Sequence, residues 1–193
     1  MKKILFVALA AVMCMTSCAS KKVAAPAKNP GYSRVEIEVP CKEYGFDNSD
    51  YFRAAGTATA VNQQNARKAA LQNAKSMIRE KLGGFVSGLS TDYSRNVAGE
   101  AQASKVQNII EGEFATLVEK ELNDAEQTCE KGFVLQDGLF EYWLAIQIPK
   151  KKLVEDLTSR LSQNEELEIE FNRDQFRKYA EEKIKAMKEA QNK

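Results

Sequence analysis

Histidine is absent from this chain of 193 residues, tryptophan occurs once and proline only four times. Without an imidazole the chain has no Ser-His-Asp triad, no Cys-His nucleophile pair and no zinc site that needs histidine. An excess of either charge is also missing, because 28 Lys and Arg residues balance 27 Asp and Glu residues. This balance gives no reason to expect a nucleic-acid partner. The remaining composition, 44% apolar and 28% charged, is typical of one folded domain with short appendages.

The N-terminus is predicted to be a lipoprotein signal peptide over residues 1–17. Lys2 and Lys3 form a basic start, and the apolar run that follows to Cys14 is too short to cross ~30 Å of hydrocarbon as a helix. The next four residues, Met-Thr-Ser-Cys, resemble the lipobox of bacterial lipoproteins and predict lipidation of Cys18. The alternative is an ordinary secretory peptide with an incidental cysteine.

Lipidation predicts where the mature protein resides. More than one acyl chain on Cys18 anchors a protein stably in a membrane. An Asp directly after the lipidated cysteine would resemble an inner-membrane retention signal, but this chain has Ala19 there. The protein is therefore expected in the outer membrane, on its periplasmic face. Small residues and two prolines predict that 18–32 is a lipidated tether rather than part of a fold.

Residues 33–161 are predicted to form one α+β domain. The segment 35–39 alternates apolar and acidic residues, which predicts a strand with one buried face. A second strand is expected over 51–60. Its alanines and Gly56 indicate a helix packed very close to it.

Two long helices are expected after these strands. Asn62 is a predicted N-cap, and an apolar stripe rich in alanine predicts a helix over 63–82 that Gly83-Gly84 should end. The segment 85–98 is predicted either to continue the helical layer or to form a loop. A second apolar stripe predicts a helix over 99–122.

A β-hairpin is predicted next, with strands over 128–136 and 139–148 joined by a two-residue turn at Asp137-Gly138. A helix over 150–161 should follow it. Trp143 and its neighbour Tyr142 either line a ligand groove or pack within the hairpin.

The last residues, 162–193, are predicted to be a charged helical extension. A thin apolar stripe runs among its Glu, Lys and Arg residues, and two interpretations stay open. The helix is either a half-solvated peripheral element or a partner-binding helix that docks through this stripe. The stripe consists of Phe176, Tyr179, Ala180, Ile184 and Met187.

Cys41 and Cys129 are the two cysteines that the predicted domain contains. A compartment outside the cytosol permits a disulfide between them, and a loop of nearly ninety residues makes such a bridge worth ~4–5 kcal/mol. The alternative is two separate buried thiols. No C-x-x-C motif activates either sulfur, so no redox catalysis is expected. No other pattern predicts a catalytic residue, a metal site or a cofactor, and the acidic run that begins at Glu165 is expected to be solvated.

Three segments together resemble a known family. They are the Gly-containing strand Tyr51–Ala58, the alanine-rich helix Ala66–Lys75 and the hairpin segment Tyr142–Ile146. They resemble the Lpp-twenty family of small bacterial outer-membrane lipoproteins over roughly residues 33–160. The resemblance implies a small, mainly antiparallel sheet with helices on one face, and a location in the cell envelope. It carries over no catalytic or binding residue.

These patterns together predict an α+β fold in which two long helices pack on one face of a small antiparallel sheet, followed by C-terminal helices. The function they favour is a non-enzymatic, lipid-anchored envelope protein that acts as a structural or adaptor module on an envelope protein partner. The alternative is a periplasmic ligand-binding lipoprotein that captures a cell-wall fragment or small molecule between the helix layer and the hairpin. An enzyme is the least favoured class.

Overall fold

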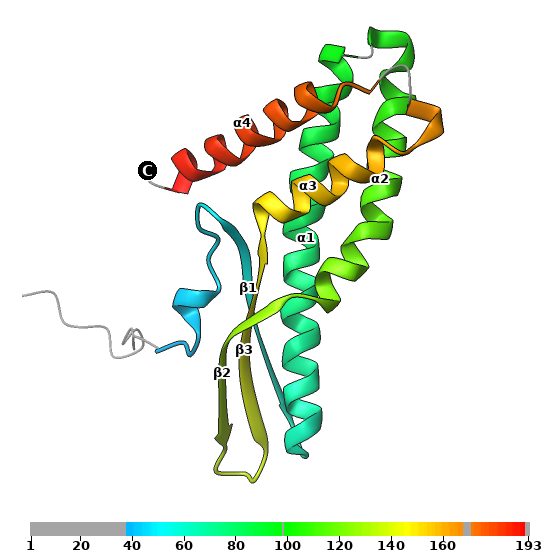
Figure 1. Ribbon diagram of the computed structural model, residues 1–193. Coiled ribbons are helices and arrows are strands. Elements are labelled where there is room, and N and C mark those ends of the chain that lie inside the picture. The colour runs from blue at the N-terminus through cyan, green and yellow to red at the C-terminus, as the bar shows by residue number, and fades with distance from the viewer. Residues whose placement is uncertain (1–37, 98, 168–170, 192–193) are drawn as a thin grey trace, which may run out of the picture. The chain divides into compact units, whose positions relative to one another are not determined.

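The computed structural model describes residues 38–97, 99–167 and 171–191. Figure 1 shows the arrangement of the elements that these residues form. In chain order they are η1 (Lys42–Tyr44), β1 (Tyr51–Ala60), α1 (Gln63–Val97), α2 (Gly99–Asn123), β2 (Glu126–Val134), β3 (Phe140–Pro149), α3 (Lys150–Leu161), η2 (Glu165–Leu167) and α4 (Arg173–Gln191).

The predicted signal peptide 1–17, the tether 18–32 and most of the predicted strand 35–39 lie outside the described residues. For its last two residues the strand prediction is wrong, because Glu38 and Val39 have no strand structure. The Val39 carbonyl instead accepts a hydrogen bond from the Lys42 N–H at 3.3 Å, in the turn that leads into η1.

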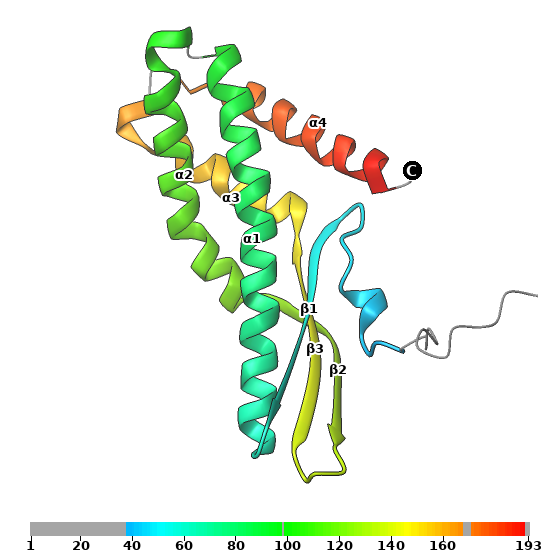
Figure 2. The same ribbon diagram turned by 180° about the vertical axis from the view of Figure 1, so that it is seen from behind.

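The three strands form an antiparallel sheet in the order β1-β3-β2. The helix layer lies on one face of this sheet (Figures 1 and 2), where α1 packs against β1 and β3 and α2 packs beside α1. The α+β fold class predicted from the sequence is therefore confirmed. Because α1 lies over β1 and β3, the outermost strand β2 projects past it, and most β2 residues are exposed.

The close approach predicted at Gly56 is confirmed. A Cβ atom at this position would lie 2.4 Å from both the Ala70 carbonyl oxygen and the Ala74 nitrogen of α1. Ala70 and Ala74 are fully buried, as is Ala66 one turn earlier. Small side chains on strand and helix therefore let the two backbones touch. Asn62 caps α1 as predicted, since its side-chain oxygen accepts the Gln64 N–H at 2.8 Å.

The predicted end of this helix at Gly83-Gly84 is wrong, because α1 runs through both glycines to Val97. The buried stripe continues on the far side of the glycines with Phe85, Leu89 and Tyr93. Two glycines inside a helix cost about 2 kcal/mol in propensity. Burial of one aromatic or leucine side chain offsets that amount, so tertiary packing decides the length of α1.

The hairpin and the helix after it lie close to their predicted positions. β2 and β3 are connected by five residues rather than two, and Gly138 has the positive φ of 82° that its turn requires. The Asp137 carboxylate closes this connection by accepting the Leu139 N–H at 3.1 Å. The helix α3 has the predicted bounds, and its apolar residues Leu153, Val154, Leu157 and Leu161 are buried.

The C-terminal helix α4 packs on α1 and α3 through its apolar stripe. Phe176 and Ala180 are fully buried, and Tyr93 of α1 lies edge-on to Phe176 with ring centroids 5.3 Å apart. The Tyr93 hydroxyl accepts the Asn172 N–H at 2.7 Å just before α4 begins. The chain's own helices therefore cover this stripe at Phe176 and Ala180, which contradicts its interpretation as a free partner-docking face.

Candidate functional site

Within the described ranges, no three His, Cys, Asp or Glu side chains lie together in a way that would hold a metal ion. No helix in the same ranges combines the length and apolar character needed to cross a bilayer. Cys18, the predicted lipidation site, lies outside the described residues.

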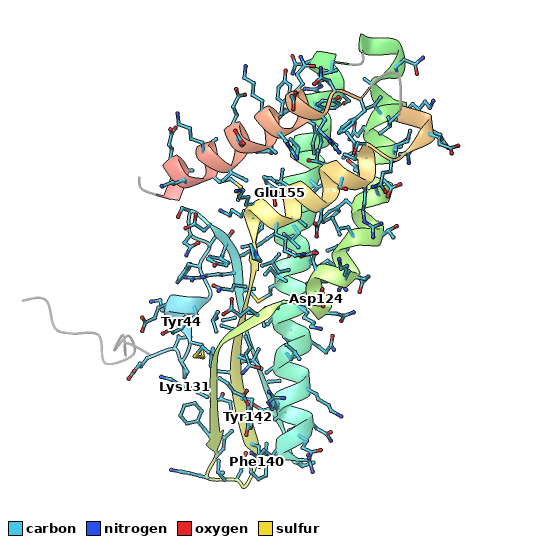
Figure 3. All side chains as sticks on the ribbon, viewed as in Figure 1. Tyr44, Asp124, Lys131, Phe140, Tyr142 and Glu155 are labelled. Atoms are coloured by element: carbon cyan, nitrogen blue, oxygen red, sulfur yellow. A yellow bond between two sulfur atoms is a disulfide. The ribbon has the colours of Figure 1, made fainter. Side chains whose placement is uncertain are left out.

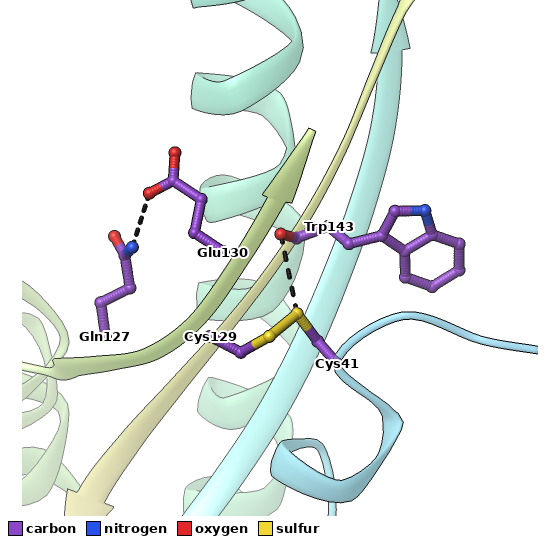
Figure 4. The surroundings of a disulfide bond; sticks show 5 residues. All are labelled: Cys41, Gln127, Cys129, Glu130 and Trp143. Carbon is purple, nitrogen blue, oxygen red and sulfur yellow. Dashed lines mark hydrogen bonds between the residues drawn. A yellow bond between two sulfur atoms is a disulfide. The ribbon is translucent and has the colours of Figure 1, made fainter. Parts of the chain in front are cut away.

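Cys41 and Cys129 form a disulfide, as the sequence analysis proposed, with their Cα atoms 5.8 Å apart. Figure 4 shows the bridge where the segment before β1 meets β2. The Cys41 sulfur lies 3.9 Å from the Trp143 carbonyl oxygen of β3. The bond joins residues 88 positions apart and fastens this N-terminal segment to the sheet beside the outermost strand.

Side chains of the same chain bond to part of the outer edge of β1, at Tyr51, Arg53 and the Thr57 carbonyl. The Asn48 side chain accepts the Tyr51 N–H at 2.8 Å, and the Asp47 carboxylate accepts the Arg53 N–H at the same distance. The Lys81 ammonium donates to the Arg53 carbonyl. The side chains that bond to this edge are Asp47, Asn48, Lys81 and, through the Thr57 carbonyl, Asn73.

The outer edge of β2 has no hydrogen-bond partner among the residues that the structure describes. The Leu135 N–H donates to the Leu139 carbonyl at 2.8 Å, so these two residues form a hydrogen-bonded pair at the end of the hairpin. Antiparallel pairs alternate, so every second β2 residue turns its N–H and C=O away from β3. In the described parts of the chain nothing bonds to these outward groups. We call them the β2 edge: the backbones of Glu130, Gly132 and Val134.

The side chains along the β2 edge have a distinct chemistry. Phe133 is 41% exposed and Val134 is 70% exposed, which is unusual for large apolar residues. Lys131, labelled in Figure 3, lies between Glu130 and Gly132 and forms no ion pair with any described residue. Lys131 and Phe133 share the face of the sheet opposite α1, because side chains alternate along a strand.

Glu130 is held in place from the helix layer. The Arg67 guanidinium of α1 contacts both carboxylate oxygens of Glu130, at 2.6 and 3.0 Å. The hydrogen bond from Arg67 lowers the pKa of Glu130, although partial burial opposes it. Gln127 donates to the same carboxylate at 2.6 Å. This cluster fixes β2 to α1, and Lys131 beside it has no ion-pair partner within the described ranges.

Tyr142 and Trp143 do not share a ligand groove. The Tyr142 side chain is buried on the helix side of the sheet, where its hydroxyl accepts the Gln63 amide N–H at 2.5 Å. Trp143 lies on the opposite face, because neighbouring strand residues point in opposite directions. The Trp143 Nε1–H is buried without an acceptor among the described protein atoms. The interpretation of the two residues as one groove is therefore wrong.

Lys150 is an ionisable residue in the core. Its ammonium donates to the Asn48 carbonyl at 2.7 Å and lies 5.1 Å from the centre of the Phe52 ring. Burial lowers the pKa of Lys150, while nearby carboxylates oppose the shift. The residue is only 1% exposed, so it fastens the loop before β1 to the start of α3 rather than facing a ligand.

Two cavities lie at the helical end of the described chain, away from the interface of α1 with the hairpin. One is a groove of about 490 Å³ between α3, α4 and the loop before β1, with Val154 and Ile184 among charged residues. The other, about 760 Å³, is polar and includes Glu113, Arg160 and Glu165. Neither lies where the sequence analysis placed a bound ligand.

No protein-family model, curated protein or solved structure matches this chain. The resemblance to the Lpp-twenty family therefore stays a prediction. Of the site residues named from the sequence, Cys41 and Cys129 are brought together and Cys18 lies outside the described part. The sequence did not predict the β2 edge, because strand order and the side chains around each edge strand are properties of the tertiary structure. The sequence does contain one indication of an exposed strand. Phe133 and Val134 are apolar neighbours, and neighbouring residues of a strand cannot both point to the same buried face.

Proposed function

We propose that this chain is a lipid-anchored protein of the bacterial cell envelope that acts without catalysis, as a structural or adaptor module. The observation that carries this proposal is the Cys41–Cys129 disulfide in a chain that begins with a lipoprotein-like signal ending at Cys18. Disulfides persist outside the reducing cytosol, so the covalent structure and the N-terminal signal favour the same compartment. Ala19 favours the outer membrane and its periplasmic face.

The lipidation site and the folded domain have separate roles in this proposal. The lipid on Cys18 localises the protein, and the α+β domain makes the contacts. The open β2 edge, with exposed Phe133 and Val134, supports protein contacts as the mode of action, since such edges accept another chain. The Lpp-twenty resemblance of residues 33–160 favours the same envelope role.

Lipidation is tested by metabolic labelling with an alkyne analogue of palmitate. Wild-type protein should carry the label and sediment with membranes, whereas Cys18→Ser should lose both properties. Cys14→Ser is the matched control, because it removes a nearby cysteine of the signal sequence and should leave labelling unchanged. Label that survives Cys18→Ser would refute the anchoring part of the proposal.

A second candidate function is periplasmic binding of a cell-wall fragment or small molecule. The groove between α3 and α4 favours it, since Val154 and Ile184 offer apolar contact beside charged groups such as Arg177 and Glu155. Thermal unfolding with soluble peptidoglycan fragments tests it. A rise in the melting temperature that Ile184→Asp abolishes would favour this function over the adaptor role.

A further inference from the structure

We propose that the β2 edge is a docking site for an extended strand of another envelope protein, and that this strand carries a carboxylate opposite Lys131. The inference rests on the proposed adaptor function and names the surface and the chemistry of its partner. The supporting observation is a difference between the two edges of the sheet in how many of their outward backbone groups are hydrogen-bonded. Side chains of the chain itself bond to the β1 edge at Tyr51, Arg53 and Thr57, while the β2 edge has no hydrogen-bond partner in the described ranges.

The backbone decides what class of partner can bind. Glu130, Gly132 and Val134 present N–H and C=O groups at the spacing of a strand ladder, and only another extended chain satisfies such a row. The helix α1 packs on β1 and β3, and most residues of β2 are exposed. The site therefore takes a strand rather than a helix or a small molecule.

The side chains decide the sequence of that strand. Lys131 has no ion-pair partner among the described residues, so a carboxylate directly opposite it supplies the missing charge. Phe133 lies two residues away on the same face and is 41% exposed, which calls for an apolar residue opposite it. Val134 adds a second apolar position on the other face.

A second copy of this chain is a poorer occupant. In an antiparallel β2–β2 pair the outward groups of even-numbered residues must face one another, so odd-numbered residues also face odd-numbered residues. Lys131 would then lie opposite Cys129, Lys131, Phe133 or Leu135, and none of these is acidic. Charge complementarity therefore disfavours β2 of a second copy as the source of the strand.

The test uses a synthetic fluorescent peptide, Val-Val-Thr-Glu-Lys-Thr, whose Glu lies opposite Lys131 when its first Val lies opposite Val134 in an antiparallel pair. Binding to the full-length mature protein in detergent is followed by fluorescence anisotropy. N-methylation of the first Thr blocks a hydrogen bond to Gly132 and should weaken binding roughly tenfold or more. N-methylation of the Glu is the matched control, because that N–H points away from β2 and binding should persist.

A charge exchange tests the pairing with Lys131. The variant Lys131→Glu should weaken binding of the Glu peptide roughly two- to fivefold, and a peptide with Lys in place of Glu should restore it. Met77→Glu is the control, since Met77 is an exposed residue of α1 away from the edge. Lys131 is exposed, so the variant should keep the wild-type circular dichroism spectrum.

Three outcomes overturn the inference: no binding of the Glu peptide at about 1 mM, equal binding of both N-methylated peptides, or equal binding of both peptide charges to Lys131→Glu. These failures are separable from failure of the proposed function, because the assay does not depend on the lipid. A protein that is labelled at Cys18 and fractionates with membranes, but ignores the peptide, would remain an anchored envelope protein with a different docking surface.

Discussion

Replacing Gly56 by alanine should destabilise the protein, while the same replacement at Gly84 should stabilise it. At Gly56 the added Cβ would lie 2.4 Å from backbone atoms of Ala70 and Ala74. Neither neighbour is a flexible side chain, so α1 must move away from β1 to accept the methyl group. At Gly84, which is exposed on the same helix, an added Cβ meets nothing within 4 Å.

The magnitudes follow from these surroundings. Overpacking at a buried contact destabilises a protein by ~1–3 kcal/mol. Alanine also restricts the unfolded chain more than glycine does, which offsets ~0.4–1 kcal/mol of that loss. We therefore expect Gly56→Ala to lower the free energy of unfolding by a net of about 1–2 kcal/mol. Gly84→Ala should raise it by about 0.8–1 kcal/mol, because alanine is the better helix former.

Thermal and urea unfolding of the mature protein, followed by circular dichroism, measures both changes. For a domain of this size each kcal/mol shifts the melting temperature by ~2–4 °C. Gly56→Ala should therefore melt a few degrees below the wild type, and Gly84→Ala a few degrees above it. A shift of the same sign for both variants would refute the argument that backbone contact at Gly56 decides the effect.

Three further predictions concern other contacts. Replacing Cys41 and Cys129 together by alanine should cost ~4–5 kcal/mol in urea unfolding, because the bridge closes a long loop; an unchanged midpoint would contradict this. The pKa of Glu130 is lower in the folded state, so its contribution to stability is present above its unfolded pKa of 4.5 and is lost as the pH falls through the folded value. Glu130→Gln should therefore flatten the acid limb of a plot of melting temperature against pH, and an unaltered limb would show that Arg67 does not stabilise the folded carboxylate. Phe176→Ala should cost ~3–5 kcal/mol, measured by urea unfolding, because the side chain is fully buried; a loss below 1 kcal/mol would mean that α4 is not part of the cooperative unit.

The local elements were readable from the sequence because their causes are local. The alanine stripe and Gly56 predicted a close contact of helix and strand, since small residues on both sides leave only one way to pack. Asn62 marked the start of α1 and Asp137-Gly138 marked the connection of the hairpin, because caps and turns depend on the conformations of one or two residues. The α3 helix was bounded correctly between Pro149 and Ser162.

Where a prediction failed, a distant contact had outweighed a local preference. Gly83-Gly84 favours a helix end, but α1 continues because Phe85 and Leu89 are buried against other parts of the chain. The stripe of α4 had two interpretations, and Tyr93, 83 residues before Phe176, decided between them by covering it. Spacing within a helix shows that a face is apolar, but not which surface covers it.

The sequence by itself therefore predicted the fold class and most of the local elements, and it holds the two cysteines available for a disulfide, while the compartment that its N-terminus indicates stays a prediction. Only the tertiary structure decided that Cys41 and Cys129 meet, that side chains bond to part of the β1 edge and that no described residue bonds to the outward groups of β2. The reason is that strand order is a long-range property. Each strand carries the same backbone groups, and its neighbours in space determine whether those groups are paired or free to bind another chain.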